Sequence, residues 1–279
     1  MEAEEAVGNV DDNCEENNGE VHENLEVMSL IVDDLETDEE VPFMNLTIKP
    51  DQFVDIHILD DSYVKIEGAP NFRQIPGFPL YGTGQPMETA MVDIVKRVKR
   101  EKEDEKVLWF SMRQEPMVYV NGEPYALRAL DKPHENLGTK LSTDQIRTVQ
   151  FHLADMLRKK LEDSGDKTLK IHKDKEYEEN PMDRVDYEET LQVDAIDDLD
   201  AVYEKCRKAC NVNLEIVHIP IIENQGPSMV YFDSIIARLK DEPASTPCVF
   251  SCQMGKGRTT VGLVAALLIK EIQLSTELR

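Results

Sequence analysis

The stretch that decides the fold is Pro247–Ile269, which reads PCVFSCQMGKGRTTVGLVAALLI. A short apolar run leads in, a loop with two glycines follows, and an apolar segment of helical length leads out. This order predicts a buried strand, a tight loop and a helix that begins where the loop ends. Cys252 and Arg258 stand at the two ends of the loop, with five residues between them.

The residues before this stretch alternate between strand and helix patterns. Strands are expected at Leu214–Ile219 and Pro247–Phe250, and helices at Ser228–Leu239 and Thr259–Ile272. Strand, helix, strand and helix in this order predict right-handed βαβ units. The expected fold class is therefore α/β, with a central, mainly parallel sheet flanked by helices.

Hydrophobic periodicity and turn residues predict the elements farther upstream. Asn121-Gly122 between two apolar runs is typical of a tight hairpin turn, because both residues tolerate positive φ. The other expected elements are a helix at Glu88–Lys99, a strand at Val107–Met112, a helix at Thr143–Leu161 capped by Ser142 or Thr143, strands at Thr168–Ile171 and Thr190–Val193, and a helix at Asp197–Ala209.

Charge is distributed unevenly along the 279 residues. The formal net charge is −25, and residues 1–40 hold 16 acidic residues and neither Lys nor Arg. We expect an acidic, disordered leader at 1–40, either a solvated extension or a tail for basic partners, before one folded domain at 41–279. That domain could be truncated, since the chain stops at Arg279 just after an apolar helix. The acidic balance argues against a nucleic-acid partner, which requires a basic face.

Targeting signals and metal motifs are not apparent in the sequence. The amino end lacks the pattern of a secretory signal and the glycine needed for myristoylation, and no apolar run predicts a transmembrane segment. The five cysteines form an odd, sparse set that is typical of reduced, intracellular thiols, so a cytoplasmic location is expected. Neither a metal nor another cofactor is expected. The cysteines are Cys14, Cys206, Cys210, Cys248 and Cys252.

Each part of the loop has a physical task in binding phosphate. A loop this short can direct its N–H groups to one centre only with unusual backbone angles, which Gly255 and Gly257 permit. The start of the following helix adds partial positive charge, and Arg258 can hold two phosphate oxygens with its planar guanidinium. The same field favours a thiolate at Cys252, which can attack phosphorus. Thr259 could donate its hydroxyl hydrogen to that sulfur.

The candidate site therefore centres on Cys252 and Arg258, and a nucleotide-binding phosphate loop is excluded. Lys256 is followed by glycine rather than Ser or Thr, and Phe250 stands where such a loop needs its first glycine. Lys256 adds a second cation at the rim, or is simply a solvated lysine. Cys248 could resolve an oxidised Cys252, although strand packing is the favoured interpretation. The expected phosphate-binding residues are Gln253, Met254, Gly255, Lys256, Gly257 and Thr259.

This arrangement resembles the Cys-x5-Arg phosphatase superfamily, and GKGR at Gly255–Arg258 is similar to the loop of tensin-type lipid phosphatases. NFR at Asn71–Arg73, YGTGQP at Tyr81–Pro86 and the stretch Trp109–Arg128 extend the likeness over about residues 71–279, to modules of the paladin family. That family belongs with phosphatases related to bacterial inositol-polyphosphate phosphatases. The resemblance implies a tyrosine-phosphatase-like fold.

The resemblance also points to Glu223 as the acid that protonates the leaving oxygen. Similar modules carry Asp at this position, and an exposed glutamate without a catalytic role stays an alternative. Ser251 stands where active tyrosine phosphatases usually carry His, which raises the chance of weak turnover. Arg113 either lines a substrate cleft or pairs with Glu115 as a structural latch, and the latch is favoured. Asp233 is expected to be a helix residue.

Two functions follow from these residues. The first is a cysteine-dependent phosphatase that hydrolyses phosphomonoesters, such as phosphoinositides or inositol phosphates, through a thiophosphate intermediate. The alternative is a catalytically weak or inactive pseudophosphatase that binds phosphorylated ligands as a regulatory scaffold. The expected partners are a phosphorylated small molecule, a lipid headgroup or a phosphoprotein, and peripheral contact with a membrane stays open.

Overall fold

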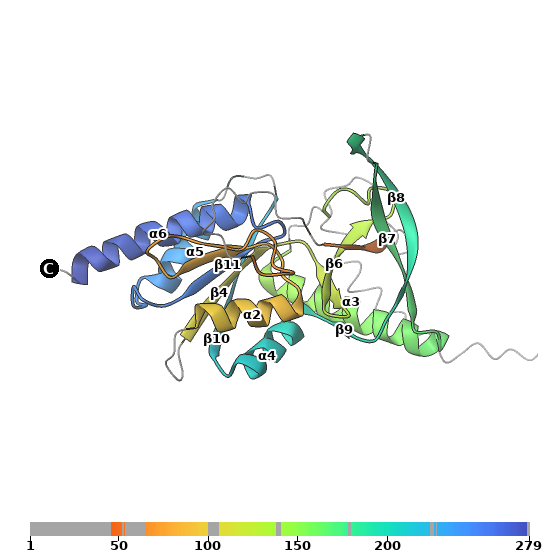
Figure 1. The fold of residues 1–279 in the computed structure, drawn as a ribbon, viewed down its shortest axis with the longest axis horizontal. Helices are drawn as coiled ribbons and strands as arrows, with labels where there is room; N and C mark the ends of the chain where they lie inside the picture. The colour runs from red at the N-terminus through yellow and green to blue at the C-terminus, as the bar shows by residue number, and fades with distance from the viewer. Residues whose placement is uncertain are drawn as a thin grey trace, which may run out of the picture.

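The fold is that of a computed structural model, which describes residues 46–51, 53, 65–99, 106–137, 141–177, 180–223, 226 and 228–277. The acidic leader expected at 1–40 lies outside the described residues. Figure 1 shows a central sheet with helices on both faces, joined to a smaller unit in which a long helix, α3, lies beside antiparallel strands.

The central sheet confirms the expected mainly parallel α/β class. Its strand order is β10-β4-β11-β3-β2, with β11 in the middle. The pairs β10/β4, β4/β11 and β11/β3 are parallel, and only β2 runs antiparallel to its neighbour. The strands are β2 (Arg73–Gln74), β3 (Leu80–Thr83), β4 (Lys106–Arg113), β10 (Asn213–Ile221) and β11 (Cys248–Ser251).

Two helix pairs cover the two faces of this sheet, because alternate residues of a strand point to opposite sides. Trp109 and Val249 pack on the face that α2 (Glu88–Val98) and α4 (Leu199–Cys210) cover. Phe110 and Phe250 stack with ring centroids 4.5 Å apart on the opposite face. The helices there are α5 (Met229–Leu239) and α6 (Gly257–Glu277).

The smaller unit is an antiparallel sheet that the sequence indicated only in part. The expected hairpin is confirmed, with positive φ at Asn121 (53°) and Gly122 (78°). Ser142 caps α3 in a capping box with Gln145, which settles the choice between the two candidate caps. The elements are β1 (Leu46–Pro50), β5 (Met117–Val120), β6 (Glu123–Ala129) and β9 (Ile196–Asp197) in the sheet, α3 (Thr143–Ser164), and the long hairpin of β7 (Thr168–Tyr177) and β8 (Asn180–Gln192).

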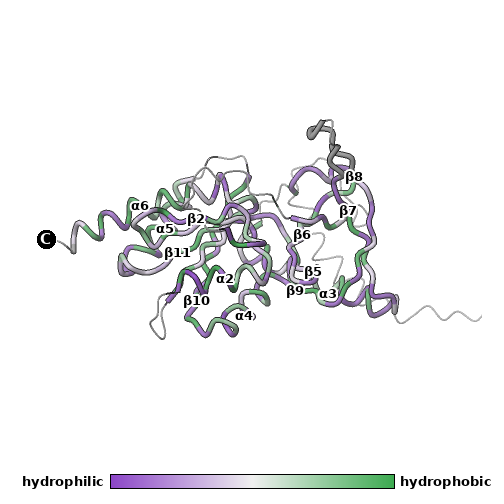
Figure 2. Tube along the Cα trace, viewed as in Figure 1, coloured by the Kyte–Doolittle hydropathy of each residue, from purple (hydrophilic) through white to green (hydrophobic). Residues whose placement is uncertain are grey.

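The last helix differs from the expectation that no segment is long and apolar enough to span a membrane. By length and composition alone, Gly257–Thr276 of α6 could cross a bilayer, with a mean hydropathy of 1.2. Figure 2 shows the hydropathy along this helix, in which Val261–Ile269 has no polar side chain and polar residues stand before and after that stretch. Its inner side, with Leu263 and Ala266, is buried against the central sheet and α5. That packing makes α6 a flanking helix of the domain.

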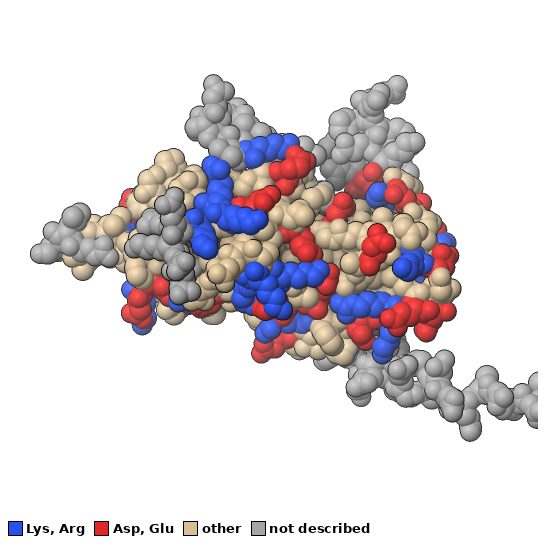
Figure 3. Space-filling model, turned by 60° about the horizontal axis from the view of Figure 1, so that its bottom comes forward, with Lys and Arg blue, Asp and Glu red and all other residues tan. Residues whose placement is uncertain are grey.

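Charged side chains of both signs share the surface. On the face seen in Figure 3, Lys and Arg side chains lie among Asp and Glu side chains. Among the described residues, charged side chains also pair, as Arg147 does with Asp200 at 2.7 Å and Lys205 with Asp197 at 2.6 Å. Exposed pairs of this kind contribute at most about 1 kcal/mol each to stability.

Candidate active site

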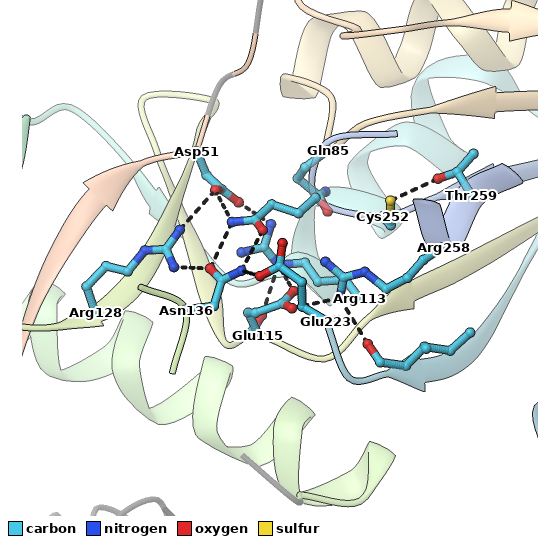
Figure 4. Close-up of polar contacts among 12 residues, drawn as sticks. Asp51, Gln85, Arg113, Glu115, Arg128, Asn136, Glu223, Cys252, Arg258 and Thr259 are labelled. Atoms are coloured by element: carbon cyan, nitrogen blue, oxygen red, sulfur yellow. Dashed lines mark hydrogen bonds and ion pairs between the residues drawn. The ribbon is translucent and has the colours of Figure 1, made fainter. Parts of the chain in front are cut away.

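The loop that follows β11 lies at the carboxyl edge of the central sheet. Cys252 comes directly after the strand, and α6 begins five residues later at Gly257. Figure 4 shows Cys252, Thr259 and Arg258 on this loop and helix, beside a cluster of polar side chains from both parts of the protein. Parallel α/β sheets commonly place their sites at this edge.

Four successive carbonyl groups of the loop are held by donors from the surrounding chain. Each accepts a hydrogen bond from a group outside the loop or from the first turns of α6, so all four carbonyls are turned away from the loop centre. The bonds run from the Gln85 N–H to Gln253 (2.9 Å), from Asn71 Nδ2 to Met254 (2.8 Å), from Arg73 Nη1 to Gly255 (2.6 Å) and from the Thr260 N–H to Lys256 (2.9 Å).

The direction of these carbonyls fixes the direction of the amides. In a planar trans peptide the C=O of one residue and the N–H of the next point opposite ways. The N–H groups of residues 254–257 are therefore directed into the loop, where the N-terminus of α6 also points. Among the described residues, none accepts a hydrogen bond from the N–H groups of Met254, Gly255 or Lys256. Such a set of convergent donors binds anions, phosphate above all.

Gly255 is the residue that permits this turn. Its φ is +76°, and a Cβ there would lie 2.3 Å from the backbone N of Gly84 and 2.6 Å from the carbonyl carbon of Thr83. Gly257 differs from the sequence-based expectation, because it is not among the glycines with positive φ and nothing lies within 4 Å of its Cβ position. The need for glycine in the loop therefore falls on Gly255.

Gly255→Ala is expected to weaken binding of inorganic phosphate or vanadate at least about tenfold. A methyl group this close to fixed backbone atoms must displace the loop. The displaced N–H groups would then no longer point to a single anion position. Isothermal titration measures the effect. Gly165→Ala is the matched control, since Gly165 also has positive φ (63°) but open space around its Cβ position. Equal affinities of the two variants would contradict the role given to Gly255.

The candidate nucleophile is buried beside a hydroxyl group. Cys252 is 2% exposed, and its Sγ lies 3.1 Å from Oγ1 of Thr259. The same hydroxyl lies 3.2 Å from the carbonyl oxygen of Thr83. It has one hydrogen to donate, so it can serve the carbonyl or the sulfur, and an ionised sulfur is the stronger acceptor. The structure thus brings Thr259 to the position that the sequence predicted.

Arg258 is oriented by a partner that the sequence did not reveal. Its Nη1 donates to Oε1 of Glu115 (2.7 Å) and to the carbonyl oxygen of Ile221 (3.0 Å). Both bonds use Nη1, and no described residue accepts from Nη2 or Nε, which are the donors available to a phosphate. Burial lowers the pKa of Arg258, but the charges of Glu115 and Cys252 outweigh it, so the net direction is upward.

The expected latch between Arg113 and Glu115 exists in a different form. Arg113 Nε donates to the backbone oxygen of Glu115 (2.9 Å) and lies 3.8 Å from its carboxylate. The carboxylate instead serves Arg258, and the Nη1 of Arg113 pairs with the carboxylate of Asp51. Arg113 is 5% exposed, which favours the structural role over a place in a cleft.

A buried polar cluster extends from Arg113 toward the smaller unit (Figure 4). Asp51, which follows β1, is fully buried, and its Oδ1 accepts from Nε2 of Gln253 at 2.7 Å and lies 3.7 Å from Arg128. Asn136, between β6 and α3, pairs with the side-chain amide of Gln253 and accepts from Arg128. The residue after the nucleophile is thereby tied to the smaller unit.

Glu223 lies two residues beyond β10 and reaches this cluster. It is half-buried, and its Oε2 accepts from Nδ2 of Asn136. Figure 4 shows Glu223 within the cluster, among Asn136, Arg113 and Glu115. Asp233, in contrast, is an exposed residue of α5, as the sequence predicted.

Ser251 and the remaining thiols have structural partners. The buried Oγ of Ser251 accepts from the indole Nε1 of Trp109 at 2.8 Å, which ties the start of the loop to β4. Burial raises the pKa of the Cys248 thiol to about 12, which favours strand packing over a redox role. Cys206 and Cys210 are buried core thiols of α4. Among the described residues, no group of three or more His, Cys, Asp or Glu could hold a metal ion.

Several residues that build the site carried no chemical signal in the sequence. Arg73 and Gln85 stand in stretches that supported the family resemblance, yet nothing showed that they hold loop carbonyls. Arg128 ends another of those stretches, whereas Asp51 and Asn136 lie outside any motif. Polar residues in otherwise apolar segments were the one available hint, because a buried charge needs a partner.

Comparison with known proteins places the chain in a family. Residues 110–270 match the model of the PTP-like phytase family, which is described as "Inositol hexakisphosphate". Paladin from Homo sapiens is 27% identical over 211 residues, which cover 74% of this chain and 21% of that protein. Paladin from Gallus gallus is 27% identical over 212 residues, with 74% and 22% covered. The chain spans about a fifth of the length of these relatives.

Solved structures confirm the fold. The tandemly repeated protein tyrosine phosphatase like phytase from Mitsuokella multacida aligns with a TM-score of 0.55 at 16% identity, covering 79% of this chain and 35% of that one. The PTP-like myo-inositol phosphatase from the same organism, in complex with myo-inositol-(1,3,4,5)-tetrakisphosphate, aligns with a TM-score of 0.54 at 15% identity, covering 78% and 35%. With the family model matching more than half of its residues, the chain belongs to the PTP-like phytase family.

Proposed function

We propose that this protein is a cysteine-dependent phosphatase that hydrolyses phosphomonoesters of inositol phosphates or of phosphoinositide headgroups. The observation that carries the proposal is the set of four outward carbonyls, which directs the loop amides to one point beside Cys252. Nη1 of Arg258 is held by Glu115 and by the carbonyl of Ile221, and no described residue accepts a hydrogen bond from its Nη2 or Nε. Family membership and a fold shared with a myo-inositol phosphatase support the substrate class.

The proposed reaction has two steps. In the first, the Cys252 thiolate attacks phosphorus, the bond from phosphorus to the ester oxygen breaks, and Glu223 gives its proton to that oxygen. In the second, water attacks the thiophosphate, Glu223 takes a proton from the water, and the bond from phosphorus to sulfur breaks to restore the thiolate. The loop amides and Arg258 stabilise the charge on the transferred phosphoryl group in both steps.

A positive charge beside the loop supports inositol phosphates as the substrate class, in addition to family membership. The N–H groups of residues 254–257 form the phosphate cradle of the loop. Lys256 lies half-buried on the same loop and adds a cation next to this cradle. A ring that carries several phosphates gains from such a second cation, whereas a single phosphate needs only the cradle and Arg258.

A phosphate-release panel tests the proposal. The full chain is incubated with an inositol polyphosphate, a phosphoinositide in mixed micelles and a phosphotyrosine peptide, with Cys252→Ser as the background. We expect release from the inositol-based substrates above that background. Release from the peptide alone would contradict the substrate class, and release from none of them would contradict the enzyme.

A phosphate-binding module without turnover is the second candidate. Ser251 favours it, because its hydroxyl is engaged by Trp109 and no histidine precedes the nucleophile. Glutamate in place of aspartate at position 223 favours it as well. Calorimetric binding of inositol polyphosphate by a wild-type protein that releases no phosphate would support this candidate over the first.

A further inference from the structure

A single asparagine joins the candidate acid to the phosphate loop. Asn136 lies in the connection between β6 and α3, which belongs to the smaller unit, and its side chain is in contact with both Glu223 and Gln253. We propose that Asn136 is a positioning residue that fixes the carboxylate of Glu223 for proton transfer. This inference rests on the proposed function, in which Glu223 is the general acid.

The hydrogen bonds of Asn136 are complete. Its Nδ2 donates to Oε2 of Glu223 and to Oε1 of Gln253 at 2.7 Å. Its Oδ1 accepts from Nη1 of Arg128 and from Nε2 of Gln253 at 3.0 Å. A side-chain amide has two hydrogens to donate and two lone pairs, so all four are used. A fully satisfied amide of this kind holds one rotamer.

Charged neighbours fix which way the amides face. A carboxylate only accepts and a guanidinium only donates, so neither tolerates a reversed amide. Asp51 therefore requires the nitrogen of Gln253 on its side, at 2.7 Å, and Arg128 requires the oxygen of Asn136 on its side. With both ends set, the nitrogen of Asn136 must face Glu223. The buried charges of the cluster thus determine where the acid is held.

The clasp, which is the hydrogen bond from Nδ2 of Asn136 to Oε2 of Glu223, leaves the other carboxylate oxygen of Glu223 available. Asn136 holds Oε2 of Glu223, and no described residue donates a hydrogen bond to Oε1. A carboxylic acid gives its proton from one oxygen, so a side chain held through Oε2 can still present Oε1 to the substrate. Glutamate has one more rotatable bond than aspartate, so an external restraint matters more for Glu223 than it would for the shorter residue.

Two substitutions remove the bond to Glu223 and differ in what else they remove. Asn136→Asp keeps the shape and an oxygen for Arg128, but it loses the hydrogen bonds that Asn136 donates to Glu223 and to Oε1 of Gln253, and it places a like charge beside Glu223. Asn136→Ala removes every bond. We expect both variants to lower kcat on an inositol polyphosphate by about 10²-fold, the lower end of what general acid catalysis contributes, with little change in KM.

The leaving group provides a readout that a merely structural role would not move. An alkoxide leaving from an inositol ring needs the proton, whereas the p-nitrophenolate of p-nitrophenyl phosphate departs as a stable anion. We expect a much smaller loss on p-nitrophenyl phosphate. Equal losses on both substrates would overturn the proposal. Asn213→Ala, at an exposed residue that begins β10, is the matched control and should behave as wild type on both.

A double-variant cycle identifies the residue through which Asn136 acts. In a Glu223→Gln background the acid is already lost, so adding Asn136→Asp should cause no further loss on the inositol polyphosphate. A further loss of similar size to that in the wild-type background would show that Asn136 acts elsewhere, and would overturn the proposal.

Amide hydrogen exchange tests whether Asn136 holds Glu223 in place, and it does not require the protein to be catalytically active. Exchange at Ile222 and Glu223 should be faster in Asn136→Asp than in wild type or Asn213→Ala, and unchanged exchange would overturn the proposal. A wild-type protein that releases no phosphate from either substrate would refute the proposed function and a catalytic role for the clasp. Normal release with unaffected Asn136 variants would refute the clasp alone.

Discussion

Cys252→Ser is expected to abolish phosphate release from every phosphomonoester that the wild-type protein hydrolyses. A serine hydroxyl is a much weaker nucleophile than a cysteine sulfur, so the substituted protein cannot form the covalent intermediate at a useful rate. The cradle itself does not depend on the sulfur, because its amides are set by carbonyl bonds to other residues. The expected loss is about 10⁴-fold or more in kcat, with retained phosphate binding.

Cys210→Ser is the control for this substitution. Cys210 is a buried thiol on α4, and its Sγ contacts the carbonyl oxygen of Val92 at 3.6 Å, a bond that a serine hydroxyl can also make. Phosphate release assayed for both variants should fall only in Cys252→Ser. Equal release from Cys252→Ser and wild type would exclude covalent catalysis by the sulfur.

Asp51→Ala is expected to be the most destabilising substitution of the buried cluster. Asp51 is fully buried between Arg113 and Arg128, and its removal takes away the carboxylate that both guanidinium groups share; the nearest acidic group left to Arg113 is Glu115, at 3.8 Å. Burial already lowers the pKa of Arg128, and the charge of Asp51 counteracts that effect. Removing one member of a buried pair typically costs about 3–5 kcal/mol in free energy of unfolding.

Urea unfolding measures this cost. Asp200→Ala is the matched control, because Asp200 pairs with Arg147 at 2.7 Å, yet the two side chains are 40% and 48% exposed. An exposed pair contributes at most about 1 kcal/mol, so the control should unfold close to wild type. If Asp51→Ala cost no more than Asp200→Ala, the cluster would not be the structural link between the two units.

The order of strand, loop and helix around Cys252 could be predicted because its signals lie close together in the sequence. Cys252, Arg258 and Thr259 lie within eight consecutive residues, so the strand before them and the helix after them bring them together in any α/β fold. The turn at Asn121-Gly122 and the cap at Ser142 were likewise set by neighbours along the chain. The structure agrees with both of these local predictions.

The contacts that orient these residues could not be predicted, because they join distant segments. Arg258 and Glu115 are 143 residues apart in the chain, and Gln253 and Asp51 are 202 apart. Spacing suggested the near pair Arg113 and Glu115, whereas the fold gave the Glu115 carboxylate to Arg258. Which arginine pairs with the Glu115 carboxylate depends on how distant segments of the chain pack together in the fold.

The smaller unit was underestimated for a related reason. β1 has only five residues and carries no turn signal of its own, so its place beside β6 depends on long-range pairing from Leu46↔Ala129 to Pro50↔Tyr125. Strand preference depends on neighbouring strands more than helix preference depends on neighbouring helices. Asp51 follows directly, so missing the strand also meant missing the carboxylate.

Trapping the phosphoenzyme tests the central claim most directly. The full chain is mixed with an inositol polyphosphate, quenched in acid within milliseconds, and mapped by peptide mass spectrometry. We predict a phosphoryl group on the peptide that contains Cys252, and none in Cys252→Ser. Rapid phosphate release with no phosphoryl group on Cys252, or with the group on another residue, would contradict the account.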